Sequence, residues 1–259
     1  MKTGGRTLSS VSWLTLGFLY APLFVLVLFS FNDSRYGGSW HGFTWRWYAE
    51  LFADEEILGS ALNSLLVAAV STALAVTFGT AAAVARDPRR KKSFGLGDGL
   101  LYLPLIIPEL MLAVGFLLFF GVLRWELGLA SLIAAHTTLN LPIVWLIVWA
   151  RLEKLDPRLE DAALDLGATR WIAFWKVTLP LLMPSVVAGG LMAFVISLDC
   201  FVLSFFVSGP EATTLPIQIY SMLKFAISPE VNALSTILFV ACVALVIVAW
   251  LLQGGESAT

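Results

Sequence analysis

Charged residues are scarce in this sequence. Asp, Glu, Lys and Arg together make up 13% of the 259 residues, whereas hydrophobic residues make up 59% and the mean hydropathy is +0.86. A soluble domain usually carries about 25% charged and about 45–50% apolar residues. The composition therefore excludes an ordinary soluble domain and predicts one integral membrane bundle. The net charge of −2 argues neither for nor against nucleic acid, and we expect no such partner.

Cysteines and the common motifs of enzymes are equally scarce. Cys200 and Cys242 both lie in apolar runs, so we interpret them as packed side chains, without a disulfide or metal-ligand spacing. The sequence has no Gly-x4-Gly-Lys-Ser/Thr phosphate loop, so the chain cannot bind ATP by that device alone. It also has no Gly-x-Ser-x-Gly elbow, which disfavours an intramembrane serine hydrolase. We expect no catalytic residue, cofactor or metal in this chain.

What the sequence does have is six long apolar runs. A helix needs about 20 residues to cross a hydrocarbon layer of about 30 Å. The first run is longer than the core of about 7–15 residues in a secretory signal and has no clear cleavage site, so we expect an uncleaved span. The fold class is then all-α, a polytopic membrane helical bundle of six transmembrane helices in a single domain, 1–259. The spans are expected at about 11–31, 57–85, 99–123, 127–150, 184–207 and 231–252.

Basic residues indicate how these spans are oriented. The N-terminus, the loop 86–92 and the loop 151–176 hold twelve of the sixteen Lys and Arg residues. Since cytoplasmic loops carry an excess of Lys and Arg, these three segments are predicted to be cytoplasmic, with both termini. On the opposite side, 32–56 is rich in Trp and Tyr. It is typical of a membrane interface, or of a short surface helix over 44–52 at the mouth of a pathway.

The longest polar interruption, 156–180, has the pattern of ordered helix. Asp156 is placed to cap a helix, with Pro157 at its first position, where a missing N–H costs nothing. An apolar face follows at helical spacing, and Gly167 is placed to end the helix because glycine adopts positive φ without a Cβ clash. A second short amphipathic piece over 171–177 runs to Leu179-Pro180. The alternative is an ordinary interfacial amphipathic helix.

The spacing in this segment resembles the coupling-loop signature of ABC importer permeases. That signature is acidic-Ala-Ala, three residues, Gly, nine residues, an aliphatic, any residue and Leu-Pro. The sequence matches it at Asp161, Ala162, Ala163, Gly167, Val177, Leu179 and Pro180, with Asp161 where Glu is commonest. The resemblance implies an ABC importer type I permease-like fold, with a cytoplasmic coupling-helix loop at 151–180. It also implies that Asp161, Ala162, Ala163 and Gly167 couple the chain to an ATPase.

Two carboxylates lie well inside the apolar runs. Such a group costs about 2.5–3.5 kcal/mol at the centre of a lone helix on insertion scales, so it normally faces a pore or a partner. Glu109 follows Pro104 and Pro108, which break the helix and free carbonyls; broken helices are tolerated where they line a cavity. With Asp199, it suits an organic cation or, alternatively, a structural role. His136 and Asn140 share one face of 127–150 and favour interhelical bonding.

The whole chain, over about residues 15–250, resembles the spermidine/putrescine branch of these permeases, the PotC/PotI type. The match rests on segments including Ser30-Phe31-Asn32-Asp33-Ser34, Pro108-Glu109, where the family usually has Pro-Asp, and Ser204–Pro210. The resemblance implies a substrate pathway lined by Trp47, Glu109, Ser197 and Asp199. Cys200 stands where the family usually has a second acid, a change that suits a smaller or less charged substrate.

The expected function is the permease subunit of an ATP-driven importer, not an enzyme by itself. It would form half of the pathway for a small organic cation such as a polyamine, or alternatively for an amino acid or another amine. The resemblance implies a bacterial inner-membrane complex with a second homologous permease, two copies of an ATP-binding subunit that hold ATP and Mg, an extracytoplasmic substrate-binding protein and membrane lipid. The competing hypotheses are a stand-alone channel or secondary transporter, or an intramembrane enzyme.

Overall fold

The computed structural model describes residues 3–34, 39–87, 95–225 and 229–253. Within these ranges the regular structure is helical, and one isolated antiparallel bridge joins Asn32 and Phe43. The chain divides into two compact units, Met1–Leu58 with Ile219–Ala244, and Gly59–Gln218 with Leu245–Thr259. Each unit is considered by itself. The basic residues predicted at Arg89–Lys92 lie outside the described part of the chain.

The first unit contains α1 (Thr3–Phe29), α2 (Arg46–Ala53) and most of α12 (Pro229–Gln253). The turn after α1 is held by the Asn32 side chain, whose Oδ1 accepts the His41 N–H at 2.8 Å and whose amide donates to the Ser39 carbonyl at 2.8 Å. Trp47 is buried, and its indole N–H donates to the Asn32 carbonyl at 2.8 Å. Exposed aromatic rings gather beside this turn, as expected at a membrane interface; they include Phe43 and Trp45.

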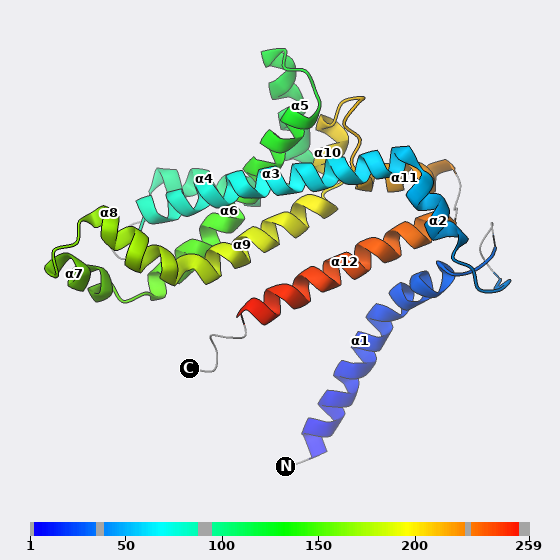
Figure 1. Ribbon diagram of the computed structural model, residues 1–259, viewed down its shortest axis with the longest axis horizontal. Helices are drawn as coiled ribbons and strands as arrows, with labels where there is room; N and C mark the ends of the chain where they lie inside the picture. The colour runs from blue at the N-terminus through cyan, green and yellow to red at the C-terminus, as the bar shows by residue number, and fades with distance from the viewer. Residues whose placement is uncertain (1–2, 35–38, 88–94, 226–228, 254–259) are drawn as a thin grey trace. The chain divides into compact units, whose positions relative to one another are not determined.

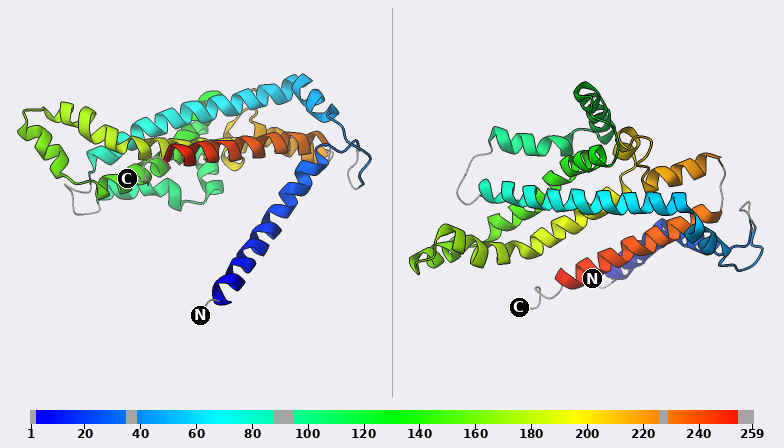
Figure 2. Two further views of the ribbon diagram at one scale, coloured as in Figure 1. Left: turned by 60° about the horizontal axis from the view of Figure 1, so that its bottom comes forward. Right: turned by 45° about the horizontal axis from the view of Figure 1, so that its top comes forward.

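The second unit is organised around three helices. These are α3 (Glu55–Ala85), α6 (Leu129–Lys154) and α9 (Leu179–Asp199), which run side by side in Figures 1 and 2. Small residues allow the close approach: a Cβ built on Gly79 of α3 would lie 3.0 Å from the Leu141 carbonyl of α6, and one on Gly190 of α9 would lie 3.0 Å from Val76 Cγ2 of α3. Glycines at such contacts are typical of membrane helix packing. The core between these helices includes Ala75, Val144, Trp145, Val148, Leu182 and Ala193.

The shorter helices of this unit lie at its two ends. The pieces α7 (Arg158–Asp165) and α8 (Arg170–Ala173) lie at the end where α6 finishes, and α10 (Val202–Val207) follows the opposite end of α9 (Figure 1). Between α3 and α6 the chain forms α4 (Leu96–Ile106) and α5 (Glu109–Leu123), and α11 (Leu215–Phe225) follows α10. A second apolar core joins α5, α6 and α10 through residues that include Phe120, Leu132, Ala135, Leu203 and Val207.

The helical architecture confirms the predicted fold class, but several boundaries differ. Four helices of the described chain are long and apolar enough to cross a membrane, five if the bent pair α4–α5 counts as one; α12 is apolar over Pro229–Ala244. The predicted number of six is therefore not reproduced by this count. The predicted span 184–207 is corrected. The helix runs from Arg170 through a π-helical segment, Phe174–Thr178, to Asp199, and residues 202–207 form the separate α10.

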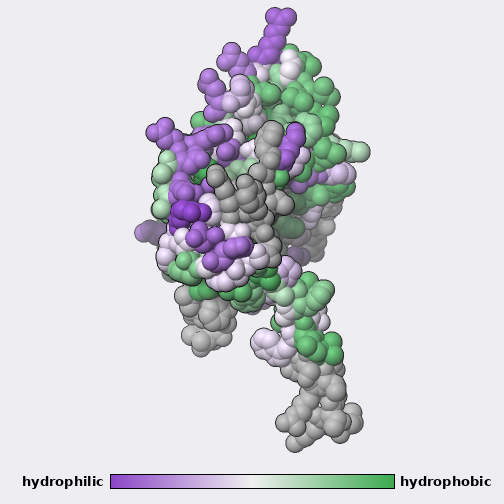
Figure 3. Space-filling view, turned by 90° about the vertical axis from the view of Figure 1, so that its right-hand side faces the viewer, coloured by the Kyte–Doolittle hydropathy of each residue, from purple (hydrophilic) through white to green (hydrophobic). Residues whose placement is uncertain are grey.

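The surface agrees with a membrane environment. Large hydrophobic side chains are exposed along α1, α3 and α5, among them Phe18, Leu62 and Val122. Figure 3 shows hydrophobic side chains over much of the visible flanks and hydrophilic ones gathered toward the face turned to the viewer. A soluble protein rarely exposes contiguous apolar surface on this scale, so lipid or partner helices would cover it.

Candidate functional site

The helix break between α4 and α5 begins with proline chemistry. The α4 helix contains Pro104 and ends at Ile106, and the next residue, Ile107, has extended backbone angles (φ −70°, ψ 129°). A proline disfavours helical backbone angles in the residue before it, and Ile107 is the residue before Pro108. Pro108 then caps α5, and the two helices meet at a bend of 109°. The predicted break is confirmed at Pro108, whereas Pro104 lies inside α4 without ending it. The break at Pro108 brings Glu109 into the first turn of α5.

A second break faces the first. The helix α9 ends at Asp199, Cys200 is extended (φ −69°, ψ 98°), and α10 begins at Val202. The end of α9 presents carbonyl groups that lack helical partners, and the helix dipole places partial negative charge there. The carboxylate of Asp199 adds to this negative charge. A bound cation would relieve the repulsion that this arrangement creates.

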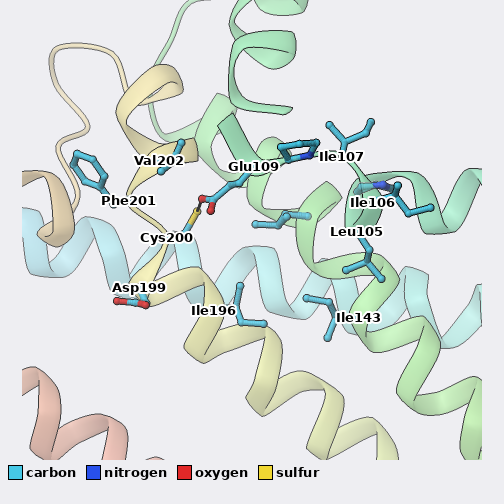
Figure 4. Close-up of a pocket in the computed structure, with 13 residues that line it drawn as sticks. Leu105, Ile106, Ile107, Glu109, Ile143, Ile196, Asp199, Cys200, Phe201 and Val202 are labelled. Atoms are coloured by element: carbon cyan, nitrogen blue, oxygen red, sulfur yellow. Dashed lines mark hydrogen bonds between the residues drawn. The ribbon is translucent and has the colours of Figure 1, made fainter. Parts of the chain in front are cut away.

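The two breaks line one cavity of about 580 Å³. Figure 4 shows that the side chains of Glu109 and Cys200 point toward each other, whereas the Asp199 carboxylate points away from them. Cys200 Sγ donates a hydrogen bond to Glu109 Oε1 at 3.3 Å. Leu139 and Ile143 of α6 also contribute to the wall. The described lining residues are Pro104, Leu105, Ile106, Ile107, Pro108, Glu109, Leu139, Ile143, Ile196, Asp199, Cys200, Phe201 and Val202.

The electrostatics of this cavity follow from that lining. Glu109 and Asp199 are acidic, and none of the other described lining residues carries a basic group. Both carboxylates are exposed, and Asp199 has no hydrogen-bond or ion-pair partner among the described residues. Apolar walls lower the local dielectric constant and so strengthen attraction to a positive charge. The described lining is therefore chemically suited to a positively charged group rather than to an anion.

The other two predicted pathway residues lie elsewhere. Ser197 is buried in α9 and is not among the cavity-lining residues; its hydroxyl bonds to His136 Nδ1 at 2.7 Å and to Ser71 Oγ at 3.2 Å. Trp47 belongs to the first unit, where it anchors the turn at Asn32. The structure thus brings Glu109 and Asp199 together, while pathway roles for Ser197 and Trp47 stay predictions. The buried bonds of His136 agree with its predicted interhelical role, whereas the Asn140 amide has no partner among the described residues.

The predicted coupling segment is an ordered elbow, which we define as residues 156–178. Asp156 Oδ1 accepts the N–H of Arg158 at 2.9 Å, as expected of a capping side chain. The helix itself begins at Arg158, one residue later than expected. Gly167 has φ +90°, a conformation that a residue with a Cβ rarely adopts, and it ends the first piece as predicted. Thr169 then caps the second piece by accepting the Ile172 N–H at 3.3 Å.

The outer face of the elbow is unusually apolar for a surface. Leu166 is 90% exposed and Trp171 is 68% exposed, and Trp171, Phe174 and Trp175 form one ring cluster. Asp161 and Ala162 are exposed, whereas Ala163 is half-buried. Exposed apolar groups ringed by charge are typical of a protein interface. The second piece does not end at Leu179-Pro180 as predicted, because the π-helical segment joins it to α9.

Sequence reasoning missed two features of the site. It did not pair Cys200 with Glu109, since 91 residues separate them. It also did not identify Ser71 and Ser204 as partners in the His136 hydrogen-bond network. Single serines in apolar runs carry little signal because they also bond to their own helix. The available signal was the set of hydroxyls at 71, 197 and 204, in two apolar runs other than the run that holds His136.

Comparison with known proteins finds relatives that match most of this chain. The chain is 40% identical over 240 residues to the spermidine/putrescine transport system permease protein PotC of Escherichia coli K12, covering 93% of this chain and 91% of PotC. It is 39% identical over 244 residues to the putrescine transport system permease protein PotI of the same organism, covering 91% and 86%. The PotC protein of Haemophilus influenzae is 40% identical, with 91% of each chain covered.

Solved structures share the fold at much lower sequence identity. A bacterial ABC transporter involved in the import of the acidic polysaccharide alginate has a chain that matches with a TM-score of 0.71 at 16% identity, covering 99% of this chain and 98% of that one. The family model described as binding-protein-dependent transport system inner membrane component matches residues 75–254. This chain therefore belongs to the family of binding-protein-dependent transport system inner membrane components, the permease subunits of ABC importers.

Proposed function

We propose that this permease forms half of the translocation pathway for a small organic cation of the polyamine class. The observation that carries the proposal is the pair of carboxylates, Glu109 and Asp199, on the wall of one cavity without a basic residue among its described lining. The relatives named for spermidine and putrescine transport support the same substrate class.

The cavity suits an extended cation better than a compact one. The carboxylates of Glu109 and Asp199 point in different directions, and apolar side chains including Leu139 and Ile143 lie on the same wall. A linear polyamine places ammonium groups at intervals along a methylene chain, so it can meet both acids while its methylenes contact the apolar wall. Charge-assisted hydrogen bonds of this kind are about twice as strong as neutral ones. Trp47 and Ser197 complete the proposed pathway.

The elbow would bind the ATP-hydrolysing subunit of the transporter. In this proposal Asp161, Ala162, Ala163 and Gly167 set a compact knob that docks on an ATP-binding subunit, present in two copies, which hydrolyses ATP with Mg. A second homologous permease supplies the other half of the pathway, and an extracytoplasmic binding protein delivers the substrate. A solved alginate transporter in complex with its substrate-bound periplasmic protein, which this chain matches with a TM-score of 0.71, supports such an arrangement. The protein would lie in a bacterial inner membrane, with the elbow and both termini cytoplasmic.

The proposal is tested by uptake into proteoliposomes that contain the co-purified complex. We expect ATP-dependent uptake of putrescine or spermidine, and loss of at least about 90% of it in Glu109→Gln and Asp199→Asn, since each removes one charge of the pair. Thr138→Val is the control, because its hydroxyl bonds only to its own helix at Ala134. A complex that imports a neutral sugar or an amino acid and ignores polyamines would contradict the substrate class. Uptake by this chain alone, without ATP, would favour a stand-alone transporter.

A further inference from the structure

A buried histidine links the two helices on either side of the α9–α10 break. His136 lies in α6 and is 1% exposed. Its Nδ1 lies 2.7 Å from the hydroxyl of Ser197 in α9, and its Nε2 lies 3.0 Å from the hydroxyl of Ser204 in α10. Both ring nitrogens of His136 therefore have a hydroxyl partner, each on a different helix.

The direction of each bond follows from counting protons. Ser204 Oγ donates its only proton to the Cys200 carbonyl at 2.7 Å, so it must accept from His136 Nε2–H. In a neutral ring Nδ1 then has no proton and accepts from Ser197. Ser197 in turn accepts from Ser71 of α3, whose contact with Ser197 at 3.2 Å is shorter than its contact with the Ala68 carbonyl at 3.4 Å. We assign His136 as the neutral Nε2–H tautomer.

The hydrogen bonds to Ser197 and Ser204 lie on either side of a chain segment that forms part of the cavity wall. Ser197 precedes Asp199 by two residues, and Ser204 bonds directly to the carbonyl of Cys200. Between them lie Asp199, Cys200, Phe201 and Val202, all of which line the cavity. Cys200 has extended backbone angles at the end of α9, and its carbonyl accepts from the Ser204 hydroxyl, so side-chain contacts help to hold the link between α9 and α10.

We propose that His136 is a positioning residue that fixes Asp199 and Cys200 for substrate binding by joining α9 to α10. The proposal rests on the substrate cavity described above and adds a residue that does not touch the substrate. The bond through Cys200 also reaches Glu109, whose Oε1 accepts from the Cys200 thiol. His136 thereby controls the spacing of both acids. When the link is lost, the acids remain but their geometry relaxes, and substrate binding weakens more than turnover.

The test measures KM and kcat for ATP-dependent polyamine uptake by the intact complex. His136→Leu removes both bonds and should raise KM by about tenfold with kcat within about twofold, the effect of losing bonds worth about 0.5–1.5 kcal/mol each. His136→Gln can retain a donor toward Ser204 and should recover part of this loss. Thr137→Val, the neighbouring residue whose hydroxyl bonds only within α6 at Ile133, should match the parent protein.

Further variants separate the possible failures. If His136→Leu does not assemble, Ser204→Ala removes the same link with a smaller change and should raise KM by about threefold to tenfold. An unchanged KM in Ser204→Ala, and in His136→Leu where it assembles, while Glu109→Gln and Asp199→Asn abolish uptake, would overturn the positioning role and leave the proposed function intact. A loss of kcat alone, or equal effects in Thr137→Val, would also overturn it. Normal uptake in both carboxylate variants would instead overturn the proposed function.

Discussion

The thiol of Cys200 lies 3.3 Å from Oε1 of Glu109 and donates a hydrogen bond to it. This contact joins the end of α9 to the start of α5, two breaks that lie 91 positions apart in the sequence. A neutral thiol satisfies one lone pair of the carboxylate and leaves the others for a ligand. Because Cys200 stands beside Asp199, its replacement by an acid would place three carboxylates around one cavity.

That arrangement predicts a change of specificity in Cys200→Asp. A third carboxylate adds attraction for each further ammonium group, so spermidine should gain relative to putrescine. We expect the ratio of their kcat/KM values for uptake to shift toward spermidine by about tenfold, which corresponds to about 1.4 kcal/mol. Cys200→Ser keeps a neutral hydrogen-bond donor and should leave the ratio unchanged. The same ratio in Cys200→Asp and Cys200→Ser would count against a cation site here.

Gly79 should be intolerant of even a methyl group. A Cβ at this position would lie 3.0 Å from the Leu141 carbonyl and 3.0 Å from Val144 Cβ, both on α6. Backbone cannot move aside cheaply, so Gly79→Ala should destabilise the fold by about 1–3 kcal/mol and lower the midpoint of thermal unfolding in detergent. Gly59→Ala on the same helix, with nothing within 4 Å, is the matched control. Equal melting temperatures for both variants would contradict this packing.

The elbow should depend on the backbone conformation of Gly167. Its φ of +90° is strained for any residue with a Cβ, so Gly167→Ala should cost about 1–2 kcal/mol locally and tilt the exposed face of the elbow. We expect substrate-stimulated ATPase activity of the assembled complex to fall several-fold. Ala162→Glu should have a similar effect by placing a larger charged group on that surface. Gly121→Ala in α5, a site with open space and ordinary φ, should be silent. Parental ATPase and uptake in the first two variants would exclude a coupling role.

Half-buried Asn63 and buried Asn140 should respond in opposite ways to leucine. Asn63 donates to the Thr213 carbonyl at 3.0 Å, whereas neither amide atom of Asn140 has a partner among the described residues. A buried polar group left unsatisfied costs about 1–3 kcal/mol, so Asn140→Leu should be neutral or stabilising and Asn63→Leu destabilising. Thermal unfolding of the two variants checks the contrast. A strongly destabilised Asn140→Leu would show that its amide has a partner, such as a buried water.

The sequence predicted those parts of the fold that depend on local chemistry. Long apolar runs predicted α3 and α6 to within a few residues, and they predicted the apolar part of α1, Val11–Phe29, although that helix begins at Thr3. Pro108 predicted the break before α5. The start of α9 was misplaced because Leu179-Pro180 was interpreted as a helix end. Pro180 lacks an N–H, and the π-helical segment Phe174–Thr178 accommodates that loss without ending the helix. The end at Asp199 was also missed, since residues 200–207 remain apolar and only the backbone angles of Cys200 mark the break.

The site was predictable in its charges but not in its connections. Glu109 and Asp199 stand out because a carboxylate in an apolar run needs a physical reason. The contact between Cys200 and Glu109, and the links from His136 to Ser197 and Ser204, depend on how distant helices pack. No periodicity within one helix encodes such pairings, so they require the three-dimensional structure.

The most direct test of the cation site is a structure of the assembled importer, trapped with a bound polyamine. We predict an amine nitrogen at a hydrogen-bond distance of about 3 Å from a carboxylate oxygen of Glu109 or Asp199 in the substrate-bound state. A polyamine bound elsewhere in the pathway, with both carboxylates beyond contact distance in every state of the cycle, would contradict the account.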